Sequence, residues 1–393
     1  MSRILVLNSG SSSLKFRLFT DDSLRTDDEP AAGEPAAGGV VERIGESGGG
    51  PADHAEALRE VLDDLDLTGL TAVGHRVVHG GLRFAEPTLI DDEVVAAITD
   101  LVPLAPLHNP ANLTGIAVAR QLLPDVPQVA VFDTAFHRTL PEAAAAYAID
   151  RQVAQRYGIR RYGFHGTSHS YVSRRTARLL GREYADTCTI TLHLGNGASA
   201  CAVAGGRSVA TSMGMSPLEG LVMGTRSGDL DPTAVLALQR TGDFSVDDVD
   251  ELLNHRSGLL GLSGANDMRE VLRRRAAGDE ASGLAFDVYC RRIRSYVGAY
   301  YAILGRLDAI TFTAGVGEHA PAVRAASLAG LERLGIVIDA ERNNAGAGAA
   351  AGGDRLISTP ESPVSVCVVG TDEESEIARQ TGSLVEGLDH GAD

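Results

Sequence analysis

Short apolar runs alternate with longer stretches of helical pattern along the 393-residue chain. The short runs are rich in residues that favour strands, and glycine-containing turns follow several of them. Strands that alternate with helices in this way are typical of an α/β protein. We therefore expect strands at 4–7, 73–78, 129–132, 189–194, 309–313 and 364–369, and helices at 53–65, 92–101, 109–123, 167–180, 283–304, 321–334 and 372–386.

Three segments share a plan in which a glycine-rich turn follows an apolar strand. ILVLNSGSSSLKFRLF (4–19) and TITLHLGNGASACAVAGG (189–206) predict a second strand after the turn, and ITFTAGVGEHAPAVR (310–324) predicts a helix. Any one of these turns by itself would be read as structural punctuation. Three in one chain favour phosphate binding, because the amides of such turns and of helix N-termini hold phosphates well. The P-loop and protein-kinase motifs are missing, so we expect a different nucleotide clamp between duplicated domains.

Other stretches mark loops and a boundary. DDEPAAGEPAAGG (27–39) and NNAGAGAAAGGD (343–354) have low complexity, and we expect surface loops with no packing role. Near residue 150 the alanine-rich AAAAYAID gives way to the basic RQVAQRYGIRRYG. We place a domain boundary there, as the length of the chain suggests two domains.

Composition and charge restrict the partners. The chain is 44% hydrophobic and 22% charged, which is ordinary for a globular enzyme, and its net charge of −17 argues against nucleic acid or an anionic membrane as a partner. The start MSRILVLNSG does not resemble a signal peptide, and no uncharged apolar run approaches the ~18 residues of a spanning helix. We expect a cytoplasmic protein whose scattered cysteines are reduced thiols, with neither a disulfide framework nor a zinc site: Cys188, Cys201, Cys290 and Cys367.

One lysine stands out, because Lys15 is the only lysine of the chain and lies in the first glycine/serine loop. Arginine is used everywhere else. An ammonium is a compact point charge on a flexible stem, whereas a guanidinium is planar and needs more room. By itself, this position would be interpreted as a lysine that is retained by chance or that pairs with a surface acid.

Ten motifs occur in order along the chain, and together they resemble the acetokinase family from residue 3 to about residue 385. They are NSGSSSLKF (8–16), GHRVVHGG (74–81), PLHNP (106–110), FDTAFH (132–137), RYGFHGTSH (161–169), HLGNGAS (193–199), SPLEGLVMGTRSGDLDP (216–232), GLSGANDMRE (261–270), FTAGVGEH (312–319) and GTDEESEIAR (370–379).

The resemblance implies a fold and an assembly. The family belongs to the acetate/sugar kinase, Hsc70 and actin superfamily, which has two duplicated actin/ribonuclease-H-like α/β domains and a hinged active-site cleft between them. The domains would be 1–149 with a returning C-terminal helix at 374–393, and a nucleotide-binding domain at 150–373. The resemblance also implies a homodimer.

The activity that the resemblance implies is a reversible, Mg²⁺-dependent and direct in-line transfer of the ATP γ-phosphoryl group to acetate. The products are ADP and acetyl phosphate, and acetyl phosphate is an intermediate of acetyl-CoA biosynthesis. Mn²⁺ is an alternative metal. Propionate kinase is the nearest alternative, because one methylene changes discrimination by only about 1–3 kcal/mol. A catalytically silent nucleotide-binding regulator is an alternative of another class. A sugar kinase is disfavoured, because arginines aimed at an anion accompany a small apolar pocket.

Transfer between two anions requires alignment and positive charge more than covalent help from the protein. The resemblance assigns Arg76 to acetate, Arg226 to the transition state and His165 to the phosphoryl oxygens in flight. It makes Asp133 the catalytic acid/base residue. A role in orienting either arginine or hydrated Mg²⁺ is equally consistent with an Asp at a strand end.

The remaining candidate residues also come from the resemblance. The metal side would use Asn8 and Glu373, with Glu374 as a competing choice. Acetate would contact His108 and a small apolar pocket of Val78, Leu107, Phe164 and Pro217. The nucleotide would contact Lys15, His193, Leu194, Gly195, Asn196, Gly197, Asp267, Met268, Arg269, Gly315, Val316, Gly317, Glu318 and His319. Two positions depart from the family pattern, which commonly has Phe or a related apolar residue at 268 and Asn at 319.

Overall fold

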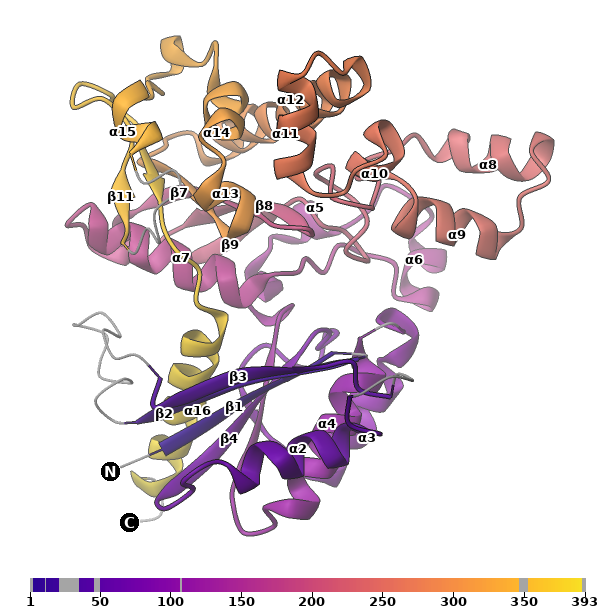
Figure 1. Cartoon of the computed structure of the whole chain (residues 1–393), viewed down its shortest axis with the longest axis vertical. Helices are drawn as coiled ribbons and strands as arrows, with labels where there is room; N and C mark the ends of the chain where they lie inside the picture. Colours follow the sequence, from indigo (N-terminus) through magenta and orange to yellow (C-terminus); the bar gives the residue numbers. More distant parts are fainter. Residues whose placement is uncertain are drawn as a thin grey trace. The chain divides into compact units, whose positions relative to one another are not determined.

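The computed structural model describes residues 3–10, 12–20, 35–45, 50–106, 108–345 and 353–390. The chain divides into two compact units, Met1–Arg138 with Asp372–Asp393 and Thr139–Thr371. Within the described residues each unit contains a six-stranded sheet with helices packed on it, so the predicted α/β fold is confirmed (Figure 1). The domain limits expected from the sequence, 1–149 with 374–393 and 150–373, stay a prediction.

The sheet of the first unit combines an antiparallel hairpin with parallel strands. β1 (Arg3–Ser9) pairs with β2 (Ser13–Thr20) in the predicted hairpin, whose register sets Asn8 opposite Lys15. On its other side β1 runs parallel to β4 (Leu70–Val77), and β4 runs parallel to β6 (Gln128–Phe132). The order is β3-β2-β1-β4-β6-β5, with β3 (Ala37–Glu42) and β5 (Thr88–Leu89) at the edges.

Helices cover both faces of this sheet. α2 (His54–Asp63), α3 (Asp92–Asp100) and α4 (Asn109–Leu122) pack on one face, and α16 (Glu373–His390) packs on the other (Figure 1). The contact between α16 and β4 is close, because a Cβ at Gly74 would lie 2.5 Å from Thr381 Oγ1. Glycine at this position therefore lets the C-terminal helix reach the sheet.

The sheet of the second unit repeats the plan of the first. β7 (Cys188–Leu194) and β8 (Ala198–Ala204) form the second predicted hairpin, and β7, β10 (Ala309–Thr313) and β12 (Ser365–Val368) run parallel. The order is β11-β12-β10-β7-β8-β9, with β11 (Arg355–Leu356) and β9 (Arg207–Thr211) at the edges. A three-strand antiparallel part followed by parallel strands and an antiparallel edge occurs in both units, as expected of duplicated domains.

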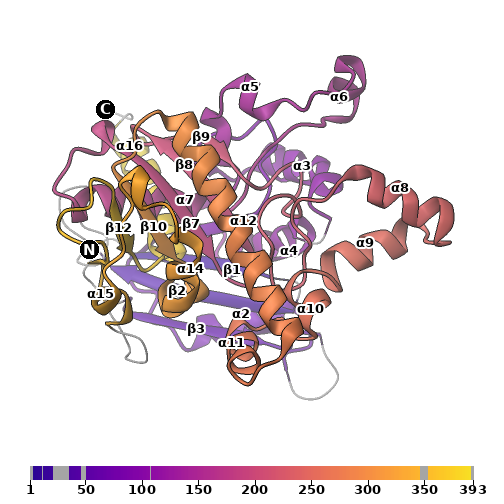
Figure 2. The same cartoon turned by 90° about the horizontal axis from the view of Figure 1, so that it is seen from above.

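Helices also sandwich the second sheet. α7 (Gly166–Leu179) covers one face, and α12 (Glu280–Leu304), α13 (Ala314–His319) and α14 (Pro321–Leu328) lie on the other (Figures 1 and 2). Alternation along β10 explains this, because the Thr311 side chain bonds to Thr176 of α7, whereas Phe312 Cβ is 3.6 Å from where a Cβ of Gly317 in α13 would lie. Every helix described is too short or too polar to cross a membrane.

Several expectations about local structure are wrong. The GVGEH stretch, expected as a turn, is the short helix α13. The expected helix 321–334 ends at Leu328, and a separate 3-10 turn follows at Glu332–Leu334. Four helices between 232 and 276 were not predicted: α8 (Pro232–Thr241), α9 (Val246–His255), α10 (Gly258–Ser263) and α11 (Met268–Ala276).

The low-complexity stretches are also more ordered than expected in their described parts. The end of 27–39 belongs to β3, whose backbone pairs with β2 whatever its side chains are. Asn343 is buried, because its amide oxygen accepts a 2.8 Å hydrogen bond from Arg324 and its carbonyl accepts another. The rest of both stretches lies outside the described residues. The four cysteines, which were expected to be reduced thiols, are free and buried.

Candidate active site

Three polar side chains meet where the parallel strands of the first unit end. Asn8 is near the end of β1, Arg76 is near the end of β4, and Asp133 directly follows β6. Ligand sites of open α/β sheets lie at the carboxyl ends of such strands. Arg76 is two residues after Gly74 on β4, so its side chain lies on the same face of the sheet, which α16 covers. Glu373 begins this helix.

Arg76 is the centre of this cluster. Its guanidinium donates to both oxygens of Asp133, with Nε 3.3 Å from Oδ1 and a shorter bond from Nη2 to Oδ2. Nη1 is 3.5 Å from Asn8 Oδ1, and Nε is 3.9 Å from Glu373 Oε2. Asp133 is 1% exposed, so the paired guanidinium offsets what would be a costly buried charge. The two-point contact fixes the plane of Arg76.

The charges of the cluster perturb one another. Burial raises the pKa of Glu373 to about 7; Arg76 opposes this shift, and Asp133 and Glu374 add to it. Burial disfavours the charged form of Arg76, but the carboxylates of Asp133 and Glu373 outweigh it and raise the pKa of the guanidinium. Carboxylates crowded in this way are typical of a site that receives a further cation.

The predicted metal-side residues fit Mg²⁺ in their donor chemistry. Asn8 and Glu373 both lie within 4 Å of the Arg76 guanidinium, and they offer amide and carboxylate oxygens, the ligands that Mg²⁺ prefers. Few protein ligands are expected, because Mg²⁺ retains several waters. In the described part of the chain no group of three or more His, Cys, Asp and Glu is placed to hold a metal by itself.

Lys15 and Glu374 form the neighbouring ion pair. Lys15 Nζ is 2.6 Å from Glu374 Oε1, and the carboxylate side chain is 5% exposed whereas the lysine side chain is 40% exposed. Glu374 therefore has a partner of its own, whereas Glu373 is the acid that lies 3.9 Å from Arg76 Nε.

The other predicted residues of the first unit lie around this cluster. His108 precedes α4 and is half-buried. Val78 is buried, and its backbone N–H donates to Asn112 Oδ1 at 3.1 Å. Leu107 lies outside the described residues.

In the second unit, His165 precedes α7 in an uncommon backbone conformation. Its φ of 57° is left-handed, which is rare for a residue other than glycine and is often found at functional positions. A Cβ at Gly197 would lie 3.5 Å from His165 Nε2 and 3.6 Å from Arg226 Nη1. The turn between β7 and β8 therefore brings its backbone beside both candidate catalytic residues of this unit. Phe164 before it is buried.

Two predicted histidines of this unit stack on each other. The rings of His165 and His193 are 4.2 Å apart at an angle of 25°. Each has a serine hydroxyl 2.8 Å from Nδ1, Ser199 for His165 and Ser168 for His193. These serines lie within predicted motifs, but no role was assigned to them from the sequence, because only a tertiary contact reveals what a buried hydroxyl serves.

Arg226 differs from Arg76 in its surroundings. Its hydrogen bonds go to neutral acceptors, Pro217 O at 3.3 Å and Met223 Sδ at 3.8 Å. Burial lowers the pKa of the Arg226 guanidinium. A half-buried cation with neutral partners is well prepared to receive an anion.

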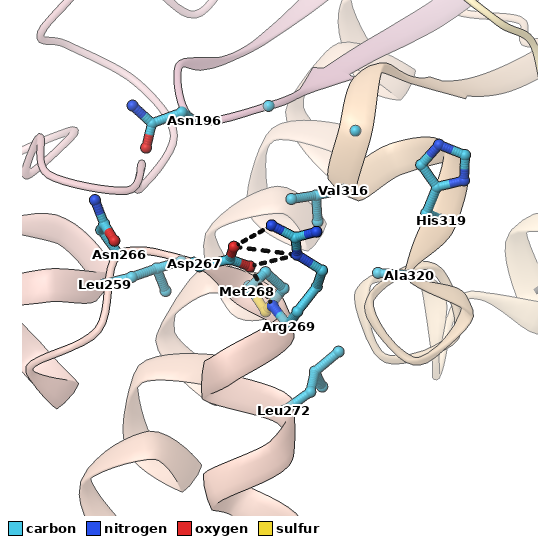
Figure 3. A pocket seen from close by; sticks show the side chains of 12 residues that line it. Asn196, Leu259, Asn266, Asp267, Met268, Arg269, Leu272, Val316, His319 and Ala320 are labelled. Atoms are coloured by element: carbon cyan, nitrogen blue, oxygen red, sulfur yellow. Dashed lines mark hydrogen bonds and ion pairs between the residues drawn. The ribbon is translucent and has the colours of Figure 1, made fainter. Parts of the chain in front are cut away.

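A pocket of about 460 Å³ in the second unit contains most of the predicted nucleotide residues (Figure 3). Its size and mixed apolar and polar lining are those of a small-molecule site. Asp267 caps the N-terminus of α11 and accepts from the Arg269 backbone N–H, and the Arg269 guanidinium folds back onto the same carboxylate (Figure 3). The predicted residues in its lining are Gly195, Asn196, Asp267, Met268, Arg269, Gly315, Val316 and His319.

The pocket lining differs from the prediction in both directions. Leu194 and Gly317 are buried, and His193, Gly197 and Glu318 also lie outside the lining. Glu318 instead accepts from the Thr371 N–H at 3.3 Å. Four lining residues were missed, because apolar and amide side chains have no distinctive spacing: Leu259, Asn266, Leu272 and Ala320.

The sequence and the fold of this chain are similar to those of known proteins. The model of the acetokinase family matches residues 3–379. The acetate kinase of Streptomyces avermitilis is 56% identical over 414 aligned positions, which cover 99% of each chain. The structure of Porphyromonas gingivalis acetate kinase has a TM-score of 0.90 at 41% identity and covers 98% of this chain and 100% of its own. A propionate kinase from Francisella tularensis has a TM-score of 0.88 at 38% identity, with coverage of 98% and 100%.

Proposed function

Because the chain belongs to the acetokinase family, we propose that it catalyses the reversible transfer of the ATP γ-phosphoryl group to acetate. The observation that carries the proposal is the similarity to acetate kinases over the whole chain together with an intact set of anion-binding side chains in both units. The protein is a phosphotransferase with a carboxyl group as acceptor.

The reaction needs no general base. Acetate is ionised at neutral pH, so a carboxylate oxygen attacks the γ-phosphorus directly while the bond to the β–γ bridging oxygen breaks. The products are acetyl phosphate and ADP, and no proton changes hands. What the protein supplies is alignment and positive charge for a transition state whose charge spreads over the equatorial oxygens.

We propose that Arg76 binds the acetate carboxylate, because a guanidinium can donate two parallel hydrogen bonds to it. Asp133 acts on Arg76, because its carboxylate accepts two hydrogen bonds from the guanidinium and so holds its orientation. This interpretation favours orientation over acid/base catalysis for Asp133. Val78, Phe164, Pro217 and Leu107 are proposed to surround the methyl group, with His108 near the carboxylate.

The transferred phosphoryl group is assigned to Arg226 and His165, which flank the backbone of Gly197. Donors held in place before the reaction need no reorganisation as charge moves, which is why such groups lower the barrier. His193 is proposed to approach the phosphates from the same turn, and the pocket at Asp267–Arg269 is proposed to take the nucleoside.

Asn8 and Glu373 would hold Mg²⁺ or Mn²⁺, directly or through water. When bound, the ion would neutralise the phosphate oxygens and help align them. Arg76 and Lys15 lie beside the carboxylates of Glu373 and Glu374 and help to hold them in place. We further propose that Lys15 approaches the ATP phosphates, that the protein is cytoplasmic, and that it acts as a homodimer, as the family resemblance implies.

Propionate is the second candidate substrate, because a propionate kinase has nearly the same fold over the whole chain. Purified protein should be incubated with ATP and Mg²⁺ and, separately, with acetate, propionate or butyrate, and the acyl phosphate should be trapped with hydroxylamine. We expect acyl hydroxamate with acetate at the highest kcat/KM. No hydroxamate with any acid would leave the regulator without catalysis as the better interpretation.

A further inference from the structure

A chain of buried polar groups lies behind the imidazole of His165. Thr191 Oγ1 is 2.7 Å from His169 Nδ1, His169 Nε2 is 2.8 Å from Ser199 Oγ, and Ser199 Oγ is 2.8 Å from His165 Nδ1. Thr191 on β7, His169 on α7 and Ser199 on β8 are all fully buried. We call these three residues the hydroxyl relay.

The direction of the hydrogen bonds in the relay follows from its far end. The Thr191 hydroxyl can donate to His169 Nδ1 at 2.7 Å or to Cys201 O at 3.5 Å. Hydroxyl hydrogen bonds centre on about 2.7–2.8 Å, and 3.5 Å lies outside their usual range. Thr191 therefore donates to His169, which makes Nδ1 of that imidazole an acceptor.

The direction then passes along the chain. Because Nδ1 of His169 accepts, the imidazole is neutral and its one proton must be on Nε2. Nε2–H donates to Ser199 Oγ. The single hydroxyl proton of Ser199 is thereby directed at His165 Nδ1, because its oxygen already accepts from His169. A neutral His165 must then carry its proton on Nε2, the nitrogen near the Gly197 backbone.

The surroundings of His165 favour the neutral ring. Three titratable or charged groups of its unit lie near the His165 ring: His193 from β7, stacked at 4.2 Å, His169 from α7, and Arg226 from the motif 216–232. Two stacked imidazolium ions beside a guanidinium would repel one another. The arrangement suits two neutral imidazoles next to one permanent cation.

We infer that Ser199 is a positioning residue that holds His165 as a neutral imidazole with its proton on Nε2. This inference rests on the proposed function, in which that N–H donates to the transferred phosphoryl group. The donor is then ready without any protonation step. Because the group is neutral, the N–H donates equally well throughout the pH range in which His165 stays uncharged.

Histidine side-chain ¹⁵N NMR tests the tautomer without any need for activity. The His165 signals are assigned by their loss in His165→Gln, and wild type should show Nε2 protonated and Nδ1 unprotonated at pH 7.5. Protonation on Nδ1, or on both nitrogens, would overturn the inference even if the enzyme is fully active. The absence of acyl phosphate formation would instead count against the proposed function alone.

Two variants test the relay through kinetics. Ser199→Ala removes the donor to Nδ1, and we expect kcat to fall about tenfold or more, the effect of one hydrogen bond, with KM for ATP and acetate changed less than about threefold. Ser199→Thr restores a hydroxyl and should recover part of kcat. Thr191→Val leaves both His165 and its serine in place, so a mixture of His165 tautomers and a smaller fall in kcat are expected.

The matched control is Ser208→Ala, which removes another buried hydroxyl of the same sheet, 3.3 Å from Cys201 Sγ. It should leave the His165 tautomer unchanged.

The pH profile completes the test. With a neutral donor, wild-type kcat does not fall from pH 7.0 to 8.5, whereas a required imidazolium would lower it roughly thirtyfold over that range. Such a fall, or unchanged kcat in Ser199→Ala, would refute the role assigned to Ser199.

Discussion

His75 should make the first unit sensitive to acid. It lies on β4 next to Arg76, is 2% exposed, and its Nε2 is 2.7 Å from Gln128 Oε1. Gln128 donates its amide protons to Leu123 O and Val126 O, so Oε1 is held as an acceptor and His75 must donate from Nε2. Burial lowers the pKa of His75 from 6.5 to about 4, and the bond to Gln128 opposes that shift only in part.

The sign and size of the effect follow from linkage. The folded pKa lies below the unfolded value, so as the pH falls the unfolded chain takes up the proton first. The contribution of His75 to stability is therefore fully present above pH 6.5 and is lost as the pH falls toward 4. With these two values the free energy of unfolding should drop by about 2.5 kcal/mol between pH 7.5 and 4.5 through His75 alone.

The perturbation is His75→Gln, which keeps a donor for Gln128 Oε1 but cannot titrate. Urea unfolding followed by circular dichroism at pH 7.5, 6.5, 5.5 and 4.5 would give the difference in unfolding free energy between wild type and variant. Other titrating groups cancel in this difference. We expect the variant to gain about 2.5 kcal/mol relative to wild type over the series. The control is His255→Gln, at an exposed position of α9.

A difference that stays constant from pH 7.5 to 4.5 would refute the reasoning. It would mean that His75 is protonated in the folded protein as easily as in the unfolded chain, and hence that its buried position costs the imidazolium nothing. A change of equal size in His255→Gln would also contradict it, because the effect would then not depend on burial.

Three further predictions concern the candidate site. Arg226→Ala should lower kcat by about 10²–10³ with little loss of stability, because its hydrogen-bond partners are neutral. Arg76→Ala should also lower the free energy of unfolding by about 3 kcal/mol, because it removes the guanidinium that donates two hydrogen bonds to the buried Asp133 carboxylate; equal stability of the two variants in urea would contradict this. Lys15→Arg should raise KM for ATP. Wild-type kinetics in this variant would mean that Lys15 has a purely structural role. Removal of divalent metal with EDTA should abolish acyl hydroxamate formation, and Mg²⁺ or Mn²⁺ should restore it; persistent activity would exclude a metal at Asn8 and Glu373.

The elements of the sheets could be predicted, because each central strand is a continuous apolar run with a turn at its end. β1, β4, β6, β7, β10 and β12 all lie within a residue or a few of their expected limits. The helices α8 to α11 could not be predicted, because they follow one another with no strand between them to mark where each helix begins and ends. α13 was taken for a turn because two of its six residues are glycine, and its position on the sheet overrides that low propensity.

For the site, the motifs located the strand ends but not the partners of each side chain. Asn8, Arg76 and Asp133 could be grouped because parallel strands end at one edge. The pairing of Arg76 with Asp133 and the hydroxyls behind His165 and His193 depend on tertiary contacts between distant segments, which sequence spacing does not encode. Leu259 and Leu272 were missed for the same reason, as a leucine that lines a pocket has the same pattern as one in a core.

Lys15 illustrates how one residue can serve both structure and site. Lys15 and Arg17 are two residues apart on β2 and therefore lie on the same face. They pair with Glu374 and Asp372 at the start of α16, at 2.6 and 3.0 Å. These two ion pairs connect the start of the returning helix to the first hairpin. Glu373 lies between the two paired acids in the sequence. The position of Glu373 opposite Arg76 thus depends on Lys15 whether or not the ammonium also reaches a phosphate. A rise in KM for ATP in Lys15→Arg with an unchanged urea midpoint would assign the lysine to the phosphate, whereas a lower midpoint with a metal requirement shifted to higher concentration would assign it to the helix.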